Sequence, residues 1–351
     1  MLLIRASITD KIPSPNYACY FFTGPKEEPA VTLAPVNPKT KLSPKCRYRR
    51  MRFPTNSRPY ARLILTLSLL LSIGGCDELQ HAPADPRQAI AEGWLDISTS
   101  QFDAAEALFI HAAETARPKS AEYLQARYGL ANACQHRKPT SKTDEARAIY
   151  KTLVELDNAG EIGAWSSLAL ARIEHLNLYA AGHAKLPEPA EIEAVRRMYQ
   201  VTIDSFPQTQ AAEESAVYSG AALIEQMSAE CATEGIAYLT AWIATHKESV
   251  YAPAAFGRLA AAYEILNRRT EQLDALIQSL GTDDDPLDDR SAIFYRIAMI
   301  ADRFAAKPEI AKQYYRKLLE NYPTDPRVYA CKRNLHRLEG QLAGADEGGR
   351  R

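Results

Sequence analysis

Cysteine is scarce in this chain and is never arranged in pairs. The six cysteines are widely separated, and no two of them form a CxxC motif. This spacing signals neither a zinc site nor a disulfide framework. We expect Cys134, Cys231 and Cys331 to be buried as small apolar side chains on helices. A single disulfide among these three is the alternative if the compartment is oxidising.

Motifs of the common enzyme classes are also missing. The seven histidines are scattered and form no HExxH motif, and neither a G-x-S-x-G nucleophile motif nor a glycine-rich phosphate loop stands out. For His111 and His175 we expect ordinary packed or surface positions, because no second ligand lies within a helical turn. We therefore predict that the protein is not an enzyme and has no catalytic, cofactor-binding or metal-binding residues. No small-molecule substrate is expected.

One dense acidic cluster, DDDPLDD, runs from Asp283 to Asp289. A calcium-binding EF-hand loop needs Gly at its sixth position and Glu at its twelfth, but here those positions hold Asp288 and Phe294. We interpret the cluster as a solvated loop that caps the following helix. After residue 75 acidic residues outnumber basic ones, and no basic stripe is evident in the sequence. This balance argues against a nucleic-acid partner.

No apolar run is long enough to cross a bilayer, which takes about 20 residues. The run from Leu63 to Ile73 has eleven residues, follows Arg52, Arg58 and Arg62, and leads into Gly74-Gly75-Cys76. A basic region, a short apolar region and small residues at a cleavage site are the parts of a secretory leader.

A cysteine directly after two glycines makes this leader resemble a bacterial lipoprotein signal peptide. The resemblance implies that residues 51–75 are removed and that Cys76 becomes the lipid attachment site. It also implies a location in the bacterial cell envelope, anchored by lipid and facing the periplasm. Asp77 follows the cysteine; under the enteric sorting rule it implies the inner membrane, and under another rule the outer membrane stays open.

Two polar segments flank the leader. Residues 1–50 are rich in proline and basic residues and lack periodicity, which is typical of disorder. They are either a disordered extension or the product of a mis-assigned start, with translation beginning at Met51. Residues 76–84 form a short spacer, and Asp85-Pro86 then has the chemistry of a helix N-cap followed by proline at the first helical position.

From residue 85 onward the sequence is typical of an all-α protein, because apolar residues recur at i, i+3 and i+4 without alternating strands. A phrase also repeats: a small residue at Ala105 is followed four residues later by Phe109 and then by Ala112. Further copies contain Ala146 with Tyr150 and Leu153, Val195 with Tyr199 and Pro207, Gly235 with Leu239 and Trp242, and Ala311 with Tyr315, Leu318 and Pro323. The small residue allows close helix approach, and the aromatic residue fills the space between hairpins.

Each such helix follows another amphipathic helix, which predicts six helical hairpins. The predicted first helices are Arg87 to Ser98 with Gly93, Ala121 to Cys134 with Gly129, Gly163 to Ala181, Ala211 to Met227 with Gly220, Ala252 to Leu266 with Gly257, and Ser291 to Phe304. A last helix from Pro326 to Leu338 would cover the final hairpin, and residues 340–351 are predicted to be a disordered tail. The fifth repeat, Arg269 to Leu280, lacks the small residue.

Together these hairpins resemble tetratricopeptide repeats (TPR), and the resemblance implies a right-handed solenoid over residues 85–339. The mean period is about 41 residues, longer than the ~34 of that family. Inserts at 135–143, 182–191 and 281–289 contain part of the excess. The period alone also allows HEAT-like hairpins, but a helix with a small residue, an aromatic residue and a terminal proline favours the TPR interpretation.

The resemblance implies a non-catalytic, lipid-anchored envelope scaffold that binds an envelope protein or peptide through the face of its first helices. The register predicts groove residues at Arg87, Trp94, Glu214 and Arg258. The chain is also similar in pattern to the TPR lipoproteins of the outer-membrane β-barrel assembly machinery, so membership of that machinery is one alternative. A periplasmic enzyme or ligand receptor that uses the inserts, above all Gly182 to Glu191, is an alternative of another class.

Overall fold

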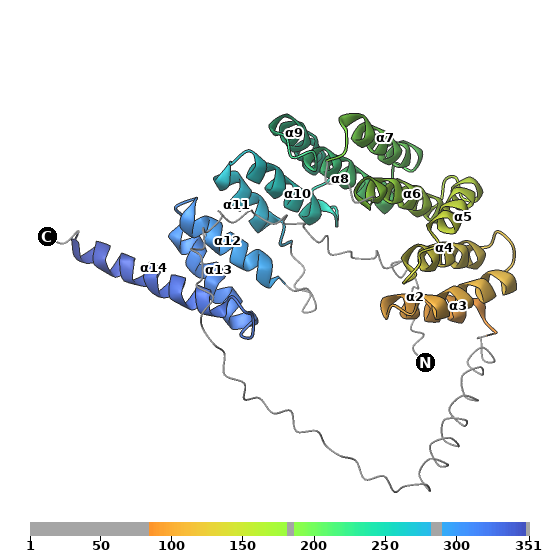
Figure 1. The fold of residues 1–351 in the computed structure, drawn as a ribbon, viewed down its shortest axis with the longest axis horizontal. Coiled ribbons are helices and arrows are strands. Elements are labelled where there is room, and N and C mark those ends of the chain that lie inside the picture. The colour runs from red at the N-terminus through yellow and green to blue at the C-terminus, as the bar shows by residue number, and fades with distance from the viewer. Residues whose placement is uncertain (1–83, 181–185, 282–289, 349–351) are drawn as a thin grey trace, which may run out of the picture. The chain divides into compact units, whose positions relative to one another are not determined.

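The structure is a computed structural model that describes residues 84–180, 186–281 and 290–348 (Figure 1). All of these residues belong to the unit that begins at Gly75. Within the described ranges the chain forms thirteen helices and no strand, which confirms the all-α prediction. Residues 1–83, with the predicted leader and Cys76, and residues 181–185 and 282–289, in two of the predicted inserts, lie outside the described ranges.

The helices follow one another as six antiparallel hairpins and a final single helix. The pairs are α2 (Pro86–Ser98) with α3 (Phe102–Thr115), α4 (Ala121–His136) with α5 (Thr143–Leu156), α6 (Glu161–Ala180) with α7 (Pro189–Ser205), α8 (Gln210–Ile224) with α9 (Ala229–Thr245), α10 (Ala252–Ile265) with α11 (Arg269–Gln278), and α12 (Ser291–Arg303) with α13 (Pro308–Asn321). The last helix is α14 (Val328–Gly348). Six hairpins and a covering helix confirm the predicted TPR-like solenoid.

Helix starts are set by local side-chain chemistry. The Asp85 carboxylate accepts a hydrogen bond from the Arg87 backbone N–H at 2.9 Å, and Pro86 occupies the first turn of α2. Ser120, Thr209 and Ser228 cap α4, α8 and α9 in the same way. Each such cap contributes about 1 kcal/mol of helix stability. The N-cap predicted at Asp85 is therefore confirmed.

The predicted packing of small residues against an aromatic ring is clearest in the first two repeats. Phe109 is fully buried, and its ring lies against both Gly93 and Gly129. A Cβ atom added to Gly129 would come within 2.3 Å of that ring, and one added to Gly93 within 2.9 Å. Gly257 differs, because a Cβ there would meet only Ser279 at 3.9 Å. The proposed role of Gly257 in close helix packing is wrong.

First helices contact one another along the stack, whereas second helices do not form such a row. In the described residues α2 packs on α4, α4 on α6, α6 on α8, and α8 on α10. No comparable contacts join α3, α5, α7, α9 and α11 to each other. The first helices from α2 to α10 therefore form one continuous row of helices in contact, whereas the second helices do not. The face formed by this row is the one on which a partner segment would touch several repeats at once.

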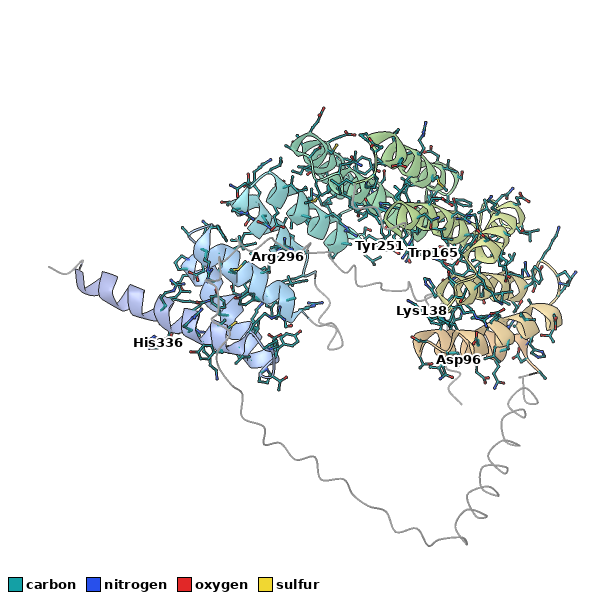
Figure 2. The ribbon with its side chains drawn as sticks, in the orientation of Figure 1. Asp96, Lys138, Trp165, Tyr251, Arg296 and His336 are labelled. Atoms are coloured by element: carbon teal, nitrogen blue, oxygen red, sulfur yellow. The ribbon has the colours of Figure 1, made fainter. Side chains whose placement is uncertain are left out.

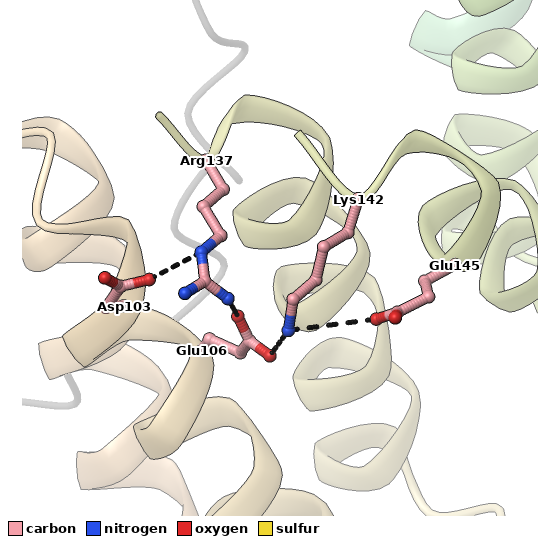
Figure 3. A network of polar contacts seen from close by, with 5 residues as sticks. All are labelled: Asp103, Glu106, Arg137, Lys142 and Glu145. Atoms are coloured by element: carbon pink, nitrogen blue, oxygen red, sulfur yellow. Dashed lines mark hydrogen bonds and ion pairs between the residues drawn. The ribbon is translucent and has the colours of Figure 1, made fainter. Parts of the chain in front are cut away.

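Ion pairs join residues that lie about one repeat apart. In Figure 3, Glu106 on α3 accepts hydrogen bonds from Arg137 (3.2 Å, Nη1 to Oε2) and from Lys142, which leads into α5. Arg137 also contacts Asp103 at 2.8 Å. Similar cross-repeat pairs are Arg87 with Glu122, Arg172 with Glu214, Arg196 with Glu234, Arg296 with Glu264 and Arg337 with Asp302. Most of these ion pairs are partly exposed, so each contributes little to the free energy of unfolding. Their main effect is to fix how neighbouring repeats align with one another.

Two observations change the predicted helix boundaries and the predicted burial of the cysteines, and a third concerns membrane-spanning helices. Helix α14 continues to Gly348, so residues 340–348 are helical where a disordered tail was predicted. Cys134 and Cys331 are buried free thiols as expected, but Cys231 is partly exposed because it lies in the first turn of α9. No helix in the described ranges combines the length and apolar character needed to cross a bilayer.

Candidate partner-binding face

A buried ion pair joins two neighbouring first helices, α6 and α8. The Arg172 guanidinium on α6 approaches the Glu214 carboxylate on α8 at 3.3 Å, and these side chains are 17% and 8% exposed. The guanidinium carbon also lies 5.1 Å from the centre of the Tyr218 ring. Arg172 is thus held by a carboxylate and an aromatic ring from the neighbouring repeat.

Electrostatics keep this arginine charged. Burial alone would lower the pKa of Arg172, but the groups at Tyr218 and Glu214 raise it above its usual value. Burial raises the pKa of the Glu214 carboxyl, while the charge of Arg172 opposes that rise. The Tyr251 hydroxyl lies beside the same carboxylate, and burial together with that negative charge raises the pKa of Tyr251. Arg172 and Glu214 thus each shift the pKa of the other, which couples α6 to α8 electrostatically.

His175 extends the network along α6. Its Nδ1 atom is 2.9 Å from the Tyr199 hydroxyl, and its Nε2 atom is 2.9 Å from Glu225 Oε2. Tyr179 donates a hydrogen bond to the same Glu225 oxygen at 3.0 Å. Burial would raise the pKa of Glu225, but its hydrogen bond with His175 lowers it below the usual value.

Tyr199 links the contacts around Arg172 to the contacts around His175. Its ring stacks on Tyr218 with centres 5.8 Å apart and an interplanar angle of 13°. A continuous path of contacts therefore runs from Glu214 and Arg172 through Tyr218 and Tyr199 to His175 and Glu225. The path crosses α6, α7 and α8, so the side chains of three helices hold one another in place. We call these six residues the Arg172–Glu225 network.

Large exposed apolar side chains border this network. Leu176 on α6 is 62% exposed and Tyr179 is 42% exposed. They lie one and four residues after His175, on the same side of α6 as Arg172. Apolar and aromatic side chains beside fixed charges are the composition of protein-binding surfaces, where aromatic residues and arginine dominate the binding energy.

The four predicted groove residues occupy different environments. Arg87 is exposed and forms an ion pair with Glu122 at 2.7 Å. Trp94 packs on Phe109 and Tyr128, with ring centres 5.4 and 6.1 Å away, so its main contacts are with the interior. Glu214 is 6% exposed and positions Arg172 instead of offering a free carboxylate. Arg258 is partly buried and its charge acts on Glu225.

Sequence reasoning thus found two members of the region, Glu214 and Arg258, and missed most of the Arg172–Glu225 network. One signal was present: Arg172 and His175 are polar residues three apart on a helix that is otherwise mainly apolar. His175 is 7% exposed, in agreement with the packed position expected for it. Its two partners come from α7 and α8 and could not be identified from spacing.

The chemistry available in this region is recognition by charge, hydrogen bonds and apolar contact. Across the described side chains, no group of three or more His, Cys, Asp or Glu residues is arranged to bind a metal ion. The most evident hollow is elsewhere, between the start of α8 and the α9–α10 loop, with a volume of about 630 Å³. It is open to solvent and is lined by polar residues such as Glu213, which accepts a hydrogen bond from Ser249 at 2.6 Å.

Comparisons with known proteins give structural neighbours but no sequence relative. No family model and no curated protein matches the chain. Among solved structures, it is similar to the APC/C hetero-tetramer Cut9-Hcn1, with a TM-score of 0.45 and 17% identity over 75% of this chain. The match spans only 44% of that structure's chain, so this chain corresponds to less than half of it.

Two further neighbours are matched over nearly their whole length. Pseudomonas aeruginosa pilF has a TM-score of 0.44 and 11% identity, over 73% of this chain and 97% of its own. A putative kinesin light chain from Podosopora anserina with TPR-like repeats has a TM-score of 0.40 and 15% identity, over 60% and 95%. These likenesses concern the fold alone. The class that the chain represents is an all-α solenoid of TPR-like hairpins.

Proposed function

We propose that the chain is a non-catalytic scaffold that binds a protein or peptide partner on the face of its first helices. The observation that carries this proposal is the Arg172–Glu225 network with the exposed Leu176 and Tyr179 beside it. Side chains already fixed before binding lose little conformational freedom when a partner arrives. The network therefore holds α6 in place against α7 and α8, and Leu176 and Tyr179 on α6 offer a pre-organised surface.

We further propose that the scaffold is a lipoprotein of a bacterial cell envelope, anchored through Cys76 and facing the periplasm. The support is the order of features before the solenoid: Arg52, Arg58 and Arg62, eleven largely apolar residues, and Gly74-Gly75-Cys76. A lipid on Cys76 would hold the solenoid close to a membrane through the short spacer of residues 76–84. Membership of the β-barrel assembly machinery is one specific form of this function.

The anchor is tested by fractionating cells that express the wild type, Cys76→Ala, or Cys231→Ala as a matched control, since Cys231 is a partly exposed free cysteine within the solenoid. We expect Cys76→Ala to remove the lipid and to leave the protein without its anchor. Wild type and Cys231→Ala should carry a lipid that is detectable by mass spectrometry of the mature N-terminus. An unmodified Cys76 in the wild type would refute the lipoprotein assignment.

The scaffold function is tested by cross-linking a tagged wild-type copy in intact cells and identifying what co-purifies. Recovery of a specific envelope protein, absent when Arg172 and Glu225 are both changed in a variant that circular dichroism shows to be folded, supports the proposal. Recovery of β-barrel assembly components from the outer membrane would identify that machinery. Equal recovery with the altered network would show that this face is not the binding surface.

A further inference from the structure

The charge of the chain changes sign between its early and late helices. Residues 84–281 contain 17 Lys and Arg against 26 Asp and Glu, whereas residues 290–348 contain 11 against 7. The three helices from α12 to α14 thus form a basic end that follows the acidic helices α2 to α11. Such local excess charge attracts oppositely charged partners and speeds their association.

Helix α14 presents one buried and one exposed face. Cys331, Asn334 and Leu338 are buried, and the Asn334 amide donates a hydrogen bond to the Tyr315 hydroxyl at 3.1 Å. The exposed face has residues at spacings of three and four, which lie in one row on a helix. This row, which we call the α14 stripe, consists of Tyr329, Lys332, Arg333, His336 and Arg337. His336 marks its position in Figure 2.

The stripe contains one exposed aromatic ring and basic side chains, of which one is held in an ion pair and two are not. Tyr329 is 77% exposed, although a ring of this size is usually more buried in a protein without a partner. Arg337 is held by Asp302 on α12. Lys332 and Arg333 are exposed, and neither forms an ion pair with a described side chain. Their charges are therefore available to carboxylates of another molecule.

We propose that the α14 stripe binds an acidic segment of a partner protein. The stripe spans nine residues of helix, from Tyr329 to Arg337, and is about 12 Å long, a length suited to one peptide segment. A membrane surface instead favours a broad cluster of basic residues, whereas Asp302 and Glu339 place carboxylates at the border of this stripe. The proposal rests on the protein-binding function proposed above and adds a second, charge-selective contact to it.

The test measures binding of a fluorescein-labelled, Glu-rich peptide containing one Phe to the full chain by fluorescence anisotropy. The variant Lys332→Glu/Arg333→Glu removes two cations from the stripe. The matched control, Arg117→Glu/Lys151→Glu, makes the same change in net charge at two exposed positions on other repeats. We expect binding of the wild type to weaken with added salt, and the stripe variant to bind about tenfold more weakly or worse.

The control variant should bind within about twofold of the wild type, and circular dichroism should show both variants folded. Equal weakening in both variants would overturn the proposal, because binding would then follow net charge alone. Stripe-dependent binding to phosphatidylcholine–phosphatidylglycerol vesicles without peptide binding would assign the stripe to membranes and also overturn it. A wild-type chain that does not bind the peptide but still captures a partner on the first-helix face would refute this inference and leave the scaffold function standing.

Discussion

Removal of Arg172 should destabilise the solenoid more than removal of any surface arginine. In Arg172→Met the Glu214 carboxylate, on a residue only 6% exposed, would lose the cation that lies 3.3 Å away. Breaking a buried pair from one side typically costs about 3–5 kcal/mol, because a charge is left without a partner. For a domain of this size, each kcal/mol lowers the Tm by about 2–4 °C. We therefore expect the Tm to fall by about 6–20 °C.

The double variant Arg172→Met/Glu214→Met separates charge from packing. Replacing both partners of a buried pair by apolar residues is often neutral or stabilising. The double variant should therefore recover most of the stability that the single variant loses. Arg196→Met is a matched control, since Arg196 also lies near a tyrosine ring, Tyr238 at 5.9 Å, but its carboxylate partners are exposed. We expect it to cost less than about 1 kcal/mol.

The assay is thermal and urea unfolding followed by circular dichroism at about pH 8 and about pH 5. Without Arg172 the pKa of Glu214, already raised by burial, should rise further. A carboxyl whose pKa is higher in the folded state takes up its proton there first, so the variant should regain stability as the pH falls. A single variant as stable as the control, a double variant as unstable as the single, or a deficit that grows toward low pH would each refute this reasoning.

Three further changes follow from the packing. Gly129→Ala should lower the free energy of unfolding in urea by about 1–3 kcal/mol, because its Cβ would lie 2.3 Å from the Phe109 ring. Adding Phe109→Leu should restore part of that loss. Increased stability of Gly129→Ala would contradict this packing. Gln272→Leu should raise the free energy of unfolding by about 1 kcal/mol, since the buried Gln272 Nε2 has no partner among the described residues. A large loss of stability would show that the hydrogen bond from Arg269 to Gln272 Oε1 contributes more than the unpaired Nε2 costs. His136 has its pKa lowered to about 4, mainly by burial, so stability should fall between about pH 6.5 and pH 4, and His136→Gln should flatten that dependence.

The fold was predictable because the same two residue types recur at the same spacing in most repeats. A small residue such as Ala105 allows two helices to approach closely, and an aromatic residue such as Phe109 fills the space beside it. Both of these residues are fully buried. The same logic failed at the fifth repeat. There Gln272 occupies the position of the small residue, α11 is ten residues long, and a Cβ on Gly257 would make only an ordinary contact with Ser279 at 3.9 Å.

The site was less predictable, for two physical reasons. Its contacts join helices that lie 24 to 50 residues apart, such as His175 with Tyr199 and with Glu225, so spacing within one helix does not reveal them. Residue type also misleads, because Trp94 fits the profile of an interface anchor but is held by Phe109 and Tyr128. The α14 stripe was missed because its basic residues become a single row only once the helix and its buried face are known.

The central claim is that the partner binds on the face of the first helices, and site-specific photo-crosslinking in intact cells tests it most directly. A photoreactive residue would replace Leu176 on α6, which is 62% exposed beside the Arg172–Glu225 network, or Val201 on α7, which is 58% exposed on a second helix. The account predicts a discrete cross-linked product from position 176 and none from position 201. Cross-linking from position 201 alone, or equally from both positions, would contradict it.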